Sequence, residues 1–509
     1  MSRHYWKIFA GIVAVQLLLA WQVPITSDEA YFCTWADHLD VNYYDHPPMV
    51  GWLIFVFSLF GRHIFFFRLI AVLTGIIVAL GIERVAARLL AAPEKSRLLS
   101  LVYLAAPLHV LFIPISTDTP LFLFTFLCGA CFAWGVRRNR PALILLAGVF
   151  WGMAVLSKYF AALLLPGLLA WLLVYRRRRL MTWGLLLAAG AAPLALLHLY
   201  WNYNDCWRTL MFNVFNRNKD QNLSIGSFTE FVFSQVYLAT PWVLYFLARQ
   251  RRAVAAGIRR DENPFFWLAV VPLGLLGLLS FFNAGLHWTL SFYPFVFLAM
   301  VDLTPEALHR IVRYSLIFSS VHVAVIAGVL LLPVSDWPKV PLVGKQAVKY
   351  DADIVMGFYG DEIFRRLAAH GDDDVLATPG YTTSALMAYH SGKHFVVFND
   401  DDRNGRNDDK VTDFRKLDGK DFLILSTRPV NPGQMEDYSL YFNRFRIEPL
   451  TVRGADYTLV RGFGFRFEAY RSRHLAKMLK DCYDIPEFLP VGDCFFYDRY
   501  FPVLSDGIP

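Results

Sequence analysis

Long apolar segments recur through the first two thirds of this chain of 509 residues. The composition is 56% hydrophobic and 18% charged, whereas soluble domains are about 45–50% apolar and about 25% charged. Eleven segments are long enough to cross a hydrocarbon core of about 30 Å. Their approximate limits are 8–25, 68–88, 98–115, 120–136, 141–157, 159–175, 180–200, 230–248, 264–282, 288–303 and 314–333. We therefore expect a polytopic α-helical membrane protein with about 11 transmembrane helices.

Basic residues cluster at alternate ends of these segments, as the positive-inside rule requires of cytoplasmic loops. The clusters are Arg3 and Lys7, residues 84–97, 137–140, 176–179, 249–260, and Arg310 with Arg313. This pattern predicts a cytoplasmic N-terminus, and an odd number of spans then places the C-terminal tail outside. The net charge of +7 is thus a topology signal, and no nucleic-acid partner is expected. No small-x-small cleavage site follows the first segment, which predicts an uncleaved first helix.

The composition changes near residue 334, where polar and charged residues rise. We expect a transmembrane domain at 1–333 and a periplasmic α/β domain at 334–509. In the latter, "DVLATPG", "YTTSALMAYHSG" and "KHFVVFN" predict strand, helix and strand, and "KDFLILST" and "DYTLVRGFGF" predict two more strands. In the first external loop, "PPMVGWLIFVFSLFG" is apolar but short, which favours an interfacial helix.

Four cysteines lie in segments predicted to be outside, where a periplasm would permit disulfides. Cys482 and Cys494 flank a short loop and form the expected pair. A pair between Cys33 and Cys206 is the second choice.

Titratable residues gather at the outer ends of the spans and not within them. They are Asp28, Glu29, Asp45, His46, Asp118, Lys158, Arg217 and His287. If the helices bundle, these side chains can surround one cavity at the outer surface. A carboxylate can act as general base on a hydroxyl, and Lys, His and Arg can neutralise a departing phosphate. Sugar transfer from a lipid-linked polyprenyl phosphate needs this combination.

The stretch "SDEAYFCTWADHLDVNYYDHPPMVGWL" resembles the first external loop of GT-C glycosyltransferases, in the family of protein O-mannosyltransferases and lipid A aminoarabinose transferases. The later segments "STDTPLFLF", "LSKYFAALLLP", "LYWNYNDCW" and "HWTLSFYP" are similar to motifs of that family in the same order. The resemblance covers residues 1–333 and is loose beyond. It implies an inverting, single displacement at the anomeric carbon.

The resemblance also implies roles for residues of the first loop. Asp28 matches the catalytic aspartate, as general base or as the group that positions the acceptor. Glu29 would orient Asp28 or help to bind a cation. Whether Mg²⁺ or Mn²⁺ takes part stays open, and Asp28 with Glu29 would be its ligands.

Further roles follow for the groups that meet the donor. Lys158 matches a basic residue that serves the phosphate, and His46 stands where the aminoarabinose branch has a lysine. Arg217 is a further candidate for the phosphate. The sugar or the acceptor would meet Tyr43, Tyr44, Asp118 and His287.

Each assignment has a structural alternative. Asp28 could cap a helix that begins at Glu29, and Asp118 could cap the next span. Lys158 could extend to outer headgroups. His46 could be an ordinary interfacial residue, and His287 could belong to the aromatic belt. The acidic sequence "DDDRNG" at 400–405 opens like a calcium loop, but position twelve is Val411, so a solvated loop is expected.

These observations predict a bacterial inner-membrane glycosyltransferase with an undecaprenyl-phosphate sugar donor. The favoured acceptor is a membrane-associated glycan, lipid A or lipopolysaccharide core. A protein hydroxyl is the enzymatic alternative. A lipid-linked sugar transporter or flippase is the alternative from another class, but the sequence shows no paired repeats and no mid-span acid. A third alternative, an envelope-assembly scaffold, gives no reason for acids and bases to share one rim.

Overall fold

A computed structural model describes residues 2–216, 222–260, 262–282, 285, 287–341, 344–349, 351–369, 373–398 and 405–502. The chain divides into two compact units, each assembled from separate parts of the sequence. The helical unit comprises Met1–Gln22, Val56–His198 and Asp220–Ile326. The sheet unit comprises Val23–Phe55, Leu199–Lys219 and Ala327–Pro509. Segments 23–55 and 199–216 therefore pack with the C-terminal part of the chain.

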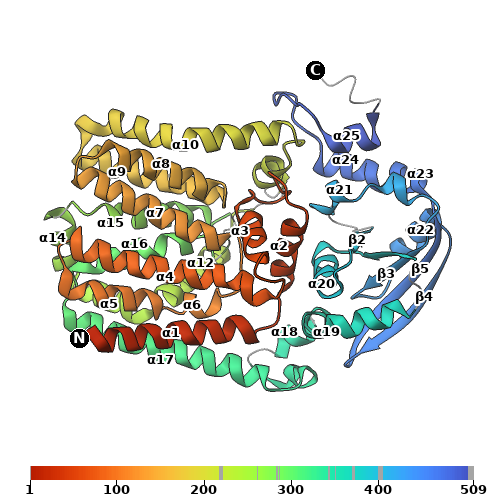
Figure 1. Cartoon of the computed structure of the whole chain (residues 1–509), viewed down its shortest axis with the longest axis horizontal. Coiled ribbons are helices and arrows are strands. Elements are labelled where there is room, and N and C mark those ends of the chain that lie inside the picture. Colours follow the sequence, from red (N-terminus) through yellow and green to blue (C-terminus); the bar gives the residue numbers. More distant parts are fainter. Residues whose placement is uncertain are drawn as a thin grey trace. The chain divides into compact units, whose positions relative to one another are not determined.

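The helical unit is a bundle whose longer helices run side by side (Figure 1). Its helices are α1 (Ser2–Gln22), α4 (Ile64–Arg88), α5 (Pro93–Leu104), α6 (Leu108–Leu111), α7 (Asp118–Arg137), α8 (Pro141–Val155), α9 (Leu164–Tyr175), α10 (Leu180–Tyr203), α12 (Ile225–Ala239), α13 (Pro241–Arg249), α14 (Arg251–Arg260), α15 (Pro264–Leu279), α16 (Tyr293–Ala299) and α17 (Pro305–Leu330). Close approach of α8 and α10 depends on glycine. A Cβ added at Gly148 would lie 2.1 Å from the Leu187 carbonyl oxygen, and one at Gly190 would lie 2.1 Å from that of Leu145.

Each of the eleven predicted segments coincides with apolar helix, but the helices differ in length. Among the described residues, 5 are long and apolar enough to cross a membrane, or up to 7 if each bent pair is one span. α12 and α13 form one bent pair, at 84°. The segment predicted at 98–115 is broken, because α5 ends at Leu104 and Pro107 precedes α6. The polytopic helical class is thus confirmed, with several segments shorter or more bent than the hydropathy indicates.

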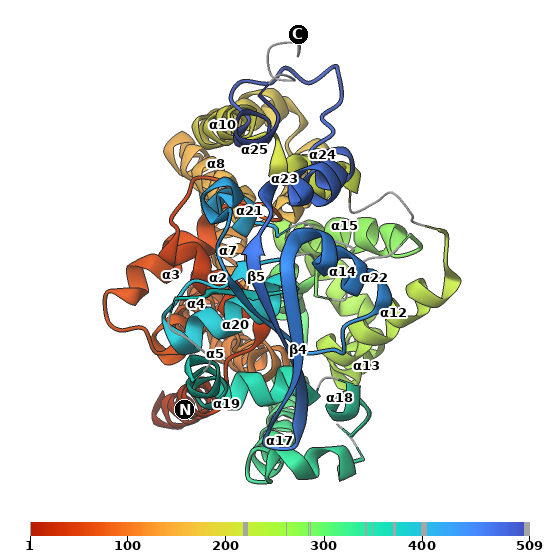
Figure 2. The same cartoon turned by 90° about the vertical axis from the view of Figure 1, so that its right-hand side faces the viewer.

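The sheet unit is built on a five-stranded mixed sheet with strand order β2-β1-β3-β5-β4. Its paired strands β4 and β5 lie side by side in Figure 2. The strands are β1 (Val375–Thr378), β2 (Val396–Val397), β3 (Phe422–Ser426), β4 (Phe442–Val452) and β5 (Ala455–Phe465). β1 pairs in parallel with β2 and β3, whereas β5 pairs antiparallel with β3 and β4. The strand, helix and strand predicted at the start of the domain are confirmed, with α20 (Tyr381–Ser391) as the helix.

Strand β4 was not predicted, because its charged residues hide the alternation typical of a strand. Arg444, Arg446 and Glu448 lie along an edge strand, and most of its residues stay accessible to solvent. It joins β5 through Arg453 and Gly454, whose φ values are 52° and 84°. Two successive residues of positive φ make the tight hairpin turn that matches the twist of the paired strands.

An aromatic core holds this sheet together. Phe398 is fully buried, and its ring centre lies 4.9 Å from that of Tyr470 and 5.0 Å from that of Phe422. Helices α22 (Pro432–Tyr441) and α23 (Phe467–Tyr470) contribute buried tyrosines to this core. Helix α20 packs against α19 (Asp351–Ala368) and against α2 (Ser27–Asp37). The C-terminal residues therefore support the helix that carries Asp28.

The disulfide differs from the predicted one. Cys494 is bonded to Cys206 and not to Cys482, so both predicted pairs, Cys482–Cys494 and Cys33–Cys206, are wrong. Two neighbouring contacts bring the partners together. The indole of Trp207 donates a 2.8 Å hydrogen bond to the Pro490 carbonyl, and the Gly492 amide donates a 3.0 Å hydrogen bond to the Tyr203 carbonyl. Proximity in sequence favoured Cys482, but the tertiary packing of segment 199–219 decided the pairing.

Candidate active site

The start of α2 positions the two acidic residues of the first loop. Thr26 is the N-cap, and its hydroxyl oxygen accepts a hydrogen bond from the Glu29 amide. The Glu29 carboxylate accepts hydrogen bonds from the Thr26 amide at 3.0 Å and from the Thr26 hydroxyl at 3.1 Å. This is a capping box, in which two backbone donors at the helix start are satisfied. Asp28 is not the cap, because the helix begins at Ser27.

Asp28 keeps its carboxylate available. The side chain is exposed, and no hydrogen bond or ion pair engages it within the described part of the chain. Solvent reaches the Asp28 side chain. The protein around it nevertheless removes part of the water from its carboxyl group. That desolvation raises the pKa of Asp28, Arg406 opposes the rise, and Asp45 and Glu29 add to it. A carboxylate of raised pKa at an accessible position is suited to accept a proton.

Glu29 is fully buried, and its contacts with Thr26 give it a structural task. A cation held by Asp28 and Glu29 stays a prediction. Among the described residues, no group of three or more His, Cys, Asp or Glu is arranged to hold a metal ion. We therefore derive no step through a metal.

Tyr43 and Tyr44 both pack against neighbouring aromatic rings. Tyr43 is fully buried, its ring stacks on Trp35 with centres 4.2 Å apart, and its hydroxyl donates to the Trp35 carbonyl at 2.8 Å. Tyr44 is 3% exposed, with its ring centre 5.2 Å from that of Phe212. Both rings are buried against protein, and a contact of either ring with the sugar stays a prediction. His46, the next candidate, is half-buried.

Asp45, one residue before His46, is held by the C-terminal part of the chain. Its carboxylate forms an ion pair with Arg406 and accepts a 3.2 Å hydrogen bond from the Tyr31 hydroxyl. The guanidinium of Arg406 lies 3.7 Å from the ring centre of Tyr381 on α20. Burial opposes the charge of Arg406, but Asp45 and the neighbouring tyrosines more than compensate and raise the pKa of Arg406.

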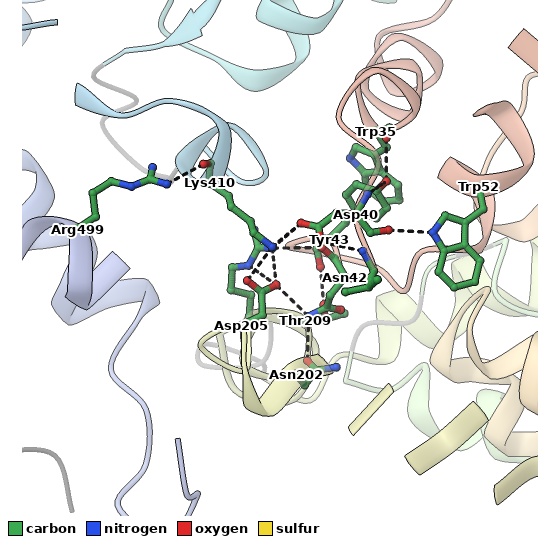
Figure 3. Close-up of polar contacts among 12 residues, drawn as sticks. Trp35, Asp40, Asn42, Tyr43, Trp52, Asn202, Asp205, Thr209, Lys410 and Arg499 are labelled. Atoms are coloured by element: carbon green, nitrogen blue, oxygen red, sulfur yellow. Dashed lines mark hydrogen bonds and ion pairs between the residues drawn. The ribbon is translucent and has the colours of Figure 1, made fainter. Parts of the chain in front are cut away.

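A second group of charges joins three segments of the sheet unit (Figure 3). The Lys410 ammonium pairs with Asp40 and lies 3.2 Å from an Asp205 oxygen. Arg208 is fully buried, donates to Asp205, and donates to the Asn42 carbonyl at 3.2 Å. Because a buried charge must be paired, this network fixes the first loop against segment 199–219 and the C-terminal domain.

The turn around Asn42 completes this network. The Thr209 hydroxyl donates to the Asn42 side-chain oxygen, and the Asn42 amide donates to Asn202 at 3.3 Å (Figure 3). The Trp52 indole donates a 2.9 Å hydrogen bond to the Asp40 carbonyl. Residues 40–45 are thus fixed at their backbone as well as at their side chains.

The helical unit brings together three predicted residues from distant segments. The Lys158 ammonium nitrogen lies 2.9 Å from each carboxylate oxygen of Asp118. His287 approaches the same carboxylate, with its Nε2 atom 3.8 Å from Oδ2. Asp118 is the first residue of α7, and Thr117 is its N-cap without a side-chain hydrogen bond. The prediction of a shared position for Asp118, Lys158 and His287 agrees with this geometry.

Asp118 also lines a small pocket of about 30 Å³ within the helical unit. Tyr103 and His109 line it as well, and within the described residues the Tyr103 hydroxyl and the His109 Nε2 are buried without a hydrogen-bond partner. Thr74, Ser116 and Thr119 add further polar side chains to the wall. A buried polar atom without a hydrogen-bond partner is costly, and a pocket of this size has room for a water molecule.

Some candidates cannot be placed. Arg217 and residues 399–404, which hold most of the acidic "DDDRNG" sequence, lie outside the described residues. Other residues of the site were missed by sequence reasoning: Asp205, Arg208, Arg406 and Lys410. The motif "LYWNYNDCW" contained the nearest signal, since it includes Asp205 and ends just before Arg208. No local sequence signal marked Arg406 or Lys410.

The fold of this chain is similar to that of two solved structures. The crystal structure of ArnT from Cupriavidus metallidurans in the apo state has a TM-score of 0.61 and 16% identity, over 90% of this chain and 98% of that chain. Its structure bound to undecaprenyl phosphate gives a TM-score of 0.62 and 14% identity, over the same shares. The fold class expected from the sequence is therefore confirmed.

Sequence comparison points the same way. Residues 45–201 match the family model of dolichyl-phosphate-mannose-protein mannosyltransferase. The lipid A galacturonosyltransferase RgtD of Rhizobium johnstonii is 29% identical over 205 residues, which is 38% of this chain. The alignment spans 43% of that relative's length. The resemblance to GT-C glycosyltransferases predicted from the sequence is confirmed.

Proposed function

We propose that this protein is an inverting glycosyltransferase that uses an undecaprenyl-phosphate sugar and modifies lipid A or the lipopolysaccharide core. The observation that carries the proposal is the Asp28 carboxylate, which is accessible, uncommitted to helix capping, and raised in pKa. Its position in the first external loop is the one that the family resemblance gives to the catalytic aspartate. The fold shared with a protein solved with undecaprenyl phosphate supports the donor class.

The proposed reaction is a single displacement. The acceptor hydroxyl oxygen attacks the anomeric carbon, and the bond from that carbon to the phosphate oxygen breaks. The hydroxyl proton passes to the Asp28 carboxylate, and undecaprenyl phosphate leaves with the bonding electron pair. The attack and the departure occur on opposite faces of the carbon, so the configuration inverts.

Lys158 is the proposed contact for the departing phosphate. Its ammonium donates to both oxygens of Asp118, and an ammonium group has three donors. Two are therefore committed and one remains for a phosphate oxygen. Asp118 holds the ammonium group in place, and His287, whose Nε2 atom lies 3.8 Å from Asp118 Oδ2, is the proposed second donor.

The acceptor and the orientation belong to the proposal as well. The lipid A galacturonosyltransferase named above favours a lipid A acceptor over a protein, and the family model named for a protein mannosyltransferase keeps the protein hydroxyl as the second candidate. The proposed orientation has the N-terminus in the cytoplasm and the C-terminal domain in the periplasm of a bacterial inner membrane, and the charge distribution supports it.

In vitro transfer tests the proposal directly. The purified protein in lipid nanodiscs is incubated with a panel of synthetic undecaprenyl-phosphate monosaccharides and with lipid A, and products are identified by mass spectrometry. One sugar should add to lipid A, and Asp28→Asn should lower the turnover by about a thousandfold while the protein stays folded. Asp361→Asn, an exposed carboxyl elsewhere in the sheet unit, is the matched control and should retain full activity.

The alternatives give different outcomes in the same experiment. Transfer to a peptide hydroxyl and not to lipid A would identify a protein glycosyltransferase. Movement of the labelled donor across a liposome membrane without transfer would identify a transporter. Full activity of Asp28→Asn would reject the assignment of the base.

A further inference from the structure

Two cations from one short segment of the C-terminal domain form ion pairs with the first loop. Arg406 pairs with Asp45, and Lys410 pairs with Asp40. Lys410 lies on α21 (Asp408–Val411), and Arg406 lies just before this helix with a φ of 55°. The two ion pairs hold the two ends of the segment 40–45, which leads into His46 and the Pro-Pro pair.

Arg406 has the more central position of the two cations. Its guanidinium lies 3.7 Å from the ring centre of Tyr381 on α20, 5.8 Å from that of Tyr31 on α2, and 5.7 Å from that of Phe212. Together with the ion pair to Asp45, these contacts join four separate segments of the sheet unit. Arginine suits such a position because its planar group stacks on rings while it pairs with a carboxylate.

The Tyr31 contact connects Arg406 to the start of α2. Tyr31 lies three residues after Asp28, and residues three apart are neighbours on a helix surface. The Tyr31 hydroxyl donates to Asp45, and its ring centre lies 4.9 Å from that of Tyr381. Loss of Arg406 would therefore loosen the helix turn that presents Asp28.

We propose that Arg406 is a positioning residue of the transferase, through which the C-terminal domain fixes the first turns of α2 and sets the charge around Asp28. This inference rests on the proposed function and extends it, because it gives the C-terminal domain a direct part in the reaction. The charged groups of the sheet unit that act on Asp28 are Arg406, Asp45 and Glu29. Arg406 acts against the other two, since it lowers the pKa of Asp28 whereas the two carboxylates raise it.

The direction in which each charge shifts the pKa of Asp28 gives the result expected from each variant. A general base must be ionised, so the acidic limb of kcat/KM against pH follows the pKa of Asp28. In Arg406→Gln this limb should move to higher pH, and kcat/KM at neutral pH should fall by about tenfold to a hundredfold. In Asp45→Asn the limb should move to lower pH. The double variant, in which both charges are removed, should have a limb between those of the single variants.

Arg453→Gln is the matched control. Arg453 pairs with Glu362 at 2.8 Å and lies 4.8 Å from the ring centre of Tyr359, so it combines an ion pair and a ring contact in the same unit. It lies outside the proposed machinery and should leave the limb unmoved. Arg406→Lys keeps the charge and should preserve the limb. Two results together would overturn the proposal: the acidic limb of kcat/KM stays in place in Arg406→Gln, and the activity falls only in proportion to the fraction of folded protein.

Hydrogen exchange provides a readout that needs no activity. Arg406→Gln should speed amide exchange in residues 27–37 relative to the wild type, and Arg453→Gln should not. If the wild type transfers no sugar, the proposed function fails, and the exchange result still decides whether Arg406 fixes α2. Unchanged exchange in Arg406→Gln would reject the positioning role. If Arg406→Gln does not fold, the double variant and Arg406→Lys carry the comparison.

Discussion

The ammonium nitrogen of Lys158 lies 2.9 Å from both carboxylate oxygens of Asp118, and both side chains are buried. The two residues come from separate helical segments, 40 positions apart in the chain. Removal of one partner of such a pair lowers the stability of the protein more than removal of both, because the remaining charge is left buried without compensation. This property separates a structural role of Lys158 from a role in donor binding.

Removal of Lys158 should affect stability and donor binding in different ways. Lys158→Met alone should destabilise the protein by about 3–5 kcal/mol, and Lys158→Met with Asp118→Asn should recover much of this loss. The donor KM should stay raised in both variants, since the phosphate contact is absent from both. Thermal unfolding in detergent and transfer kinetics measure the two effects.

The control for this prediction is an exposed pair. Lys339 lies 2.7 Å from an Asp336 oxygen with a side chain that is 78% exposed, so Lys339→Met should change neither stability nor KM appreciably. A donor KM that returns to the wild-type value in the Lys158/Asp118 double variant would remove Lys158 from the phosphate site.

Substitutions of Glu29 should distinguish capping from catalysis. Glutamine at this position of a capping box can still accept from Thr26, so Glu29→Gln should fold and retain transfer. Glu29→Ala should cost about 1 kcal/mol of stability through loss of the reciprocal cap. The measurements are turnover and the midpoint of thermal unfolding. A large loss of turnover in Glu29→Gln, without loss of stability, would show that Glu29 takes part in the chemistry.

The disulfide should stabilise the sheet unit. It closes a sequence separation of 288 residues between Cys206 and Cys494, and removal of a native disulfide typically costs about 2–5 kcal/mol. Cys206→Ala with Cys494→Ala should therefore lower the unfolding midpoint, whereas Cys482→Ser should not. Peptide mapping without reduction should recover the Cys206–Cys494 peptide pair; a Cys482–Cys494 pair would contradict the structure.

Asp409 should make the stability of the sheet unit depend on pH. Burial raises its pKa to about 8, although hydrogen bonds from the Tyr483 hydroxyl and the Gly405 amide oppose the rise. In the unfolded chain the pKa is about 3.9. The folded state thus binds the proton more tightly, so this contribution is complete below about pH 4 and is lost as the pH rises through about 8.

Asp409→Asn should remove that loss, because asparagine is neutral at every pH. Its unfolding midpoint should exceed that of the wild type by more at pH 8 than at pH 5. The contribution of Asp413 to stability has the opposite pH dependence, because a hydrogen bond from Arg415 lowers the pKa of Asp413. Asp413→Asn should therefore destabilise the protein at neutral pH and less so in acid. Parallel pH profiles for wild type and Asp409→Asn would contradict the buried, protonated state of Asp409.

The sequence predicted the parts of the site that depend on span ends. Asp118, Lys158 and His287 each stand at an end of an apolar segment, at ends that the charge pattern predicts to share one side, and helices that pack as neighbours bring such ends together. The same reasoning selected Asp28, which the structure leaves exposed, and Tyr43 and Tyr44, which it buries. Their aromatic character suits a sugar site and a protein core equally, and only the stacking of Tyr43 on Trp35 distinguishes the two.

Hydropathy by itself thus predicted a bundle of apolar helices and a small α/β domain, because burial of apolar surface follows local composition. The tertiary structure alone decided which distant residues meet. Arg406 and Asp45 are 361 positions apart, and Lys410 and Asp40 are 370 apart. Paired charges so far apart leave no pattern along the chain, since each cation needs only a nearby carboxylate and the fold selects which one.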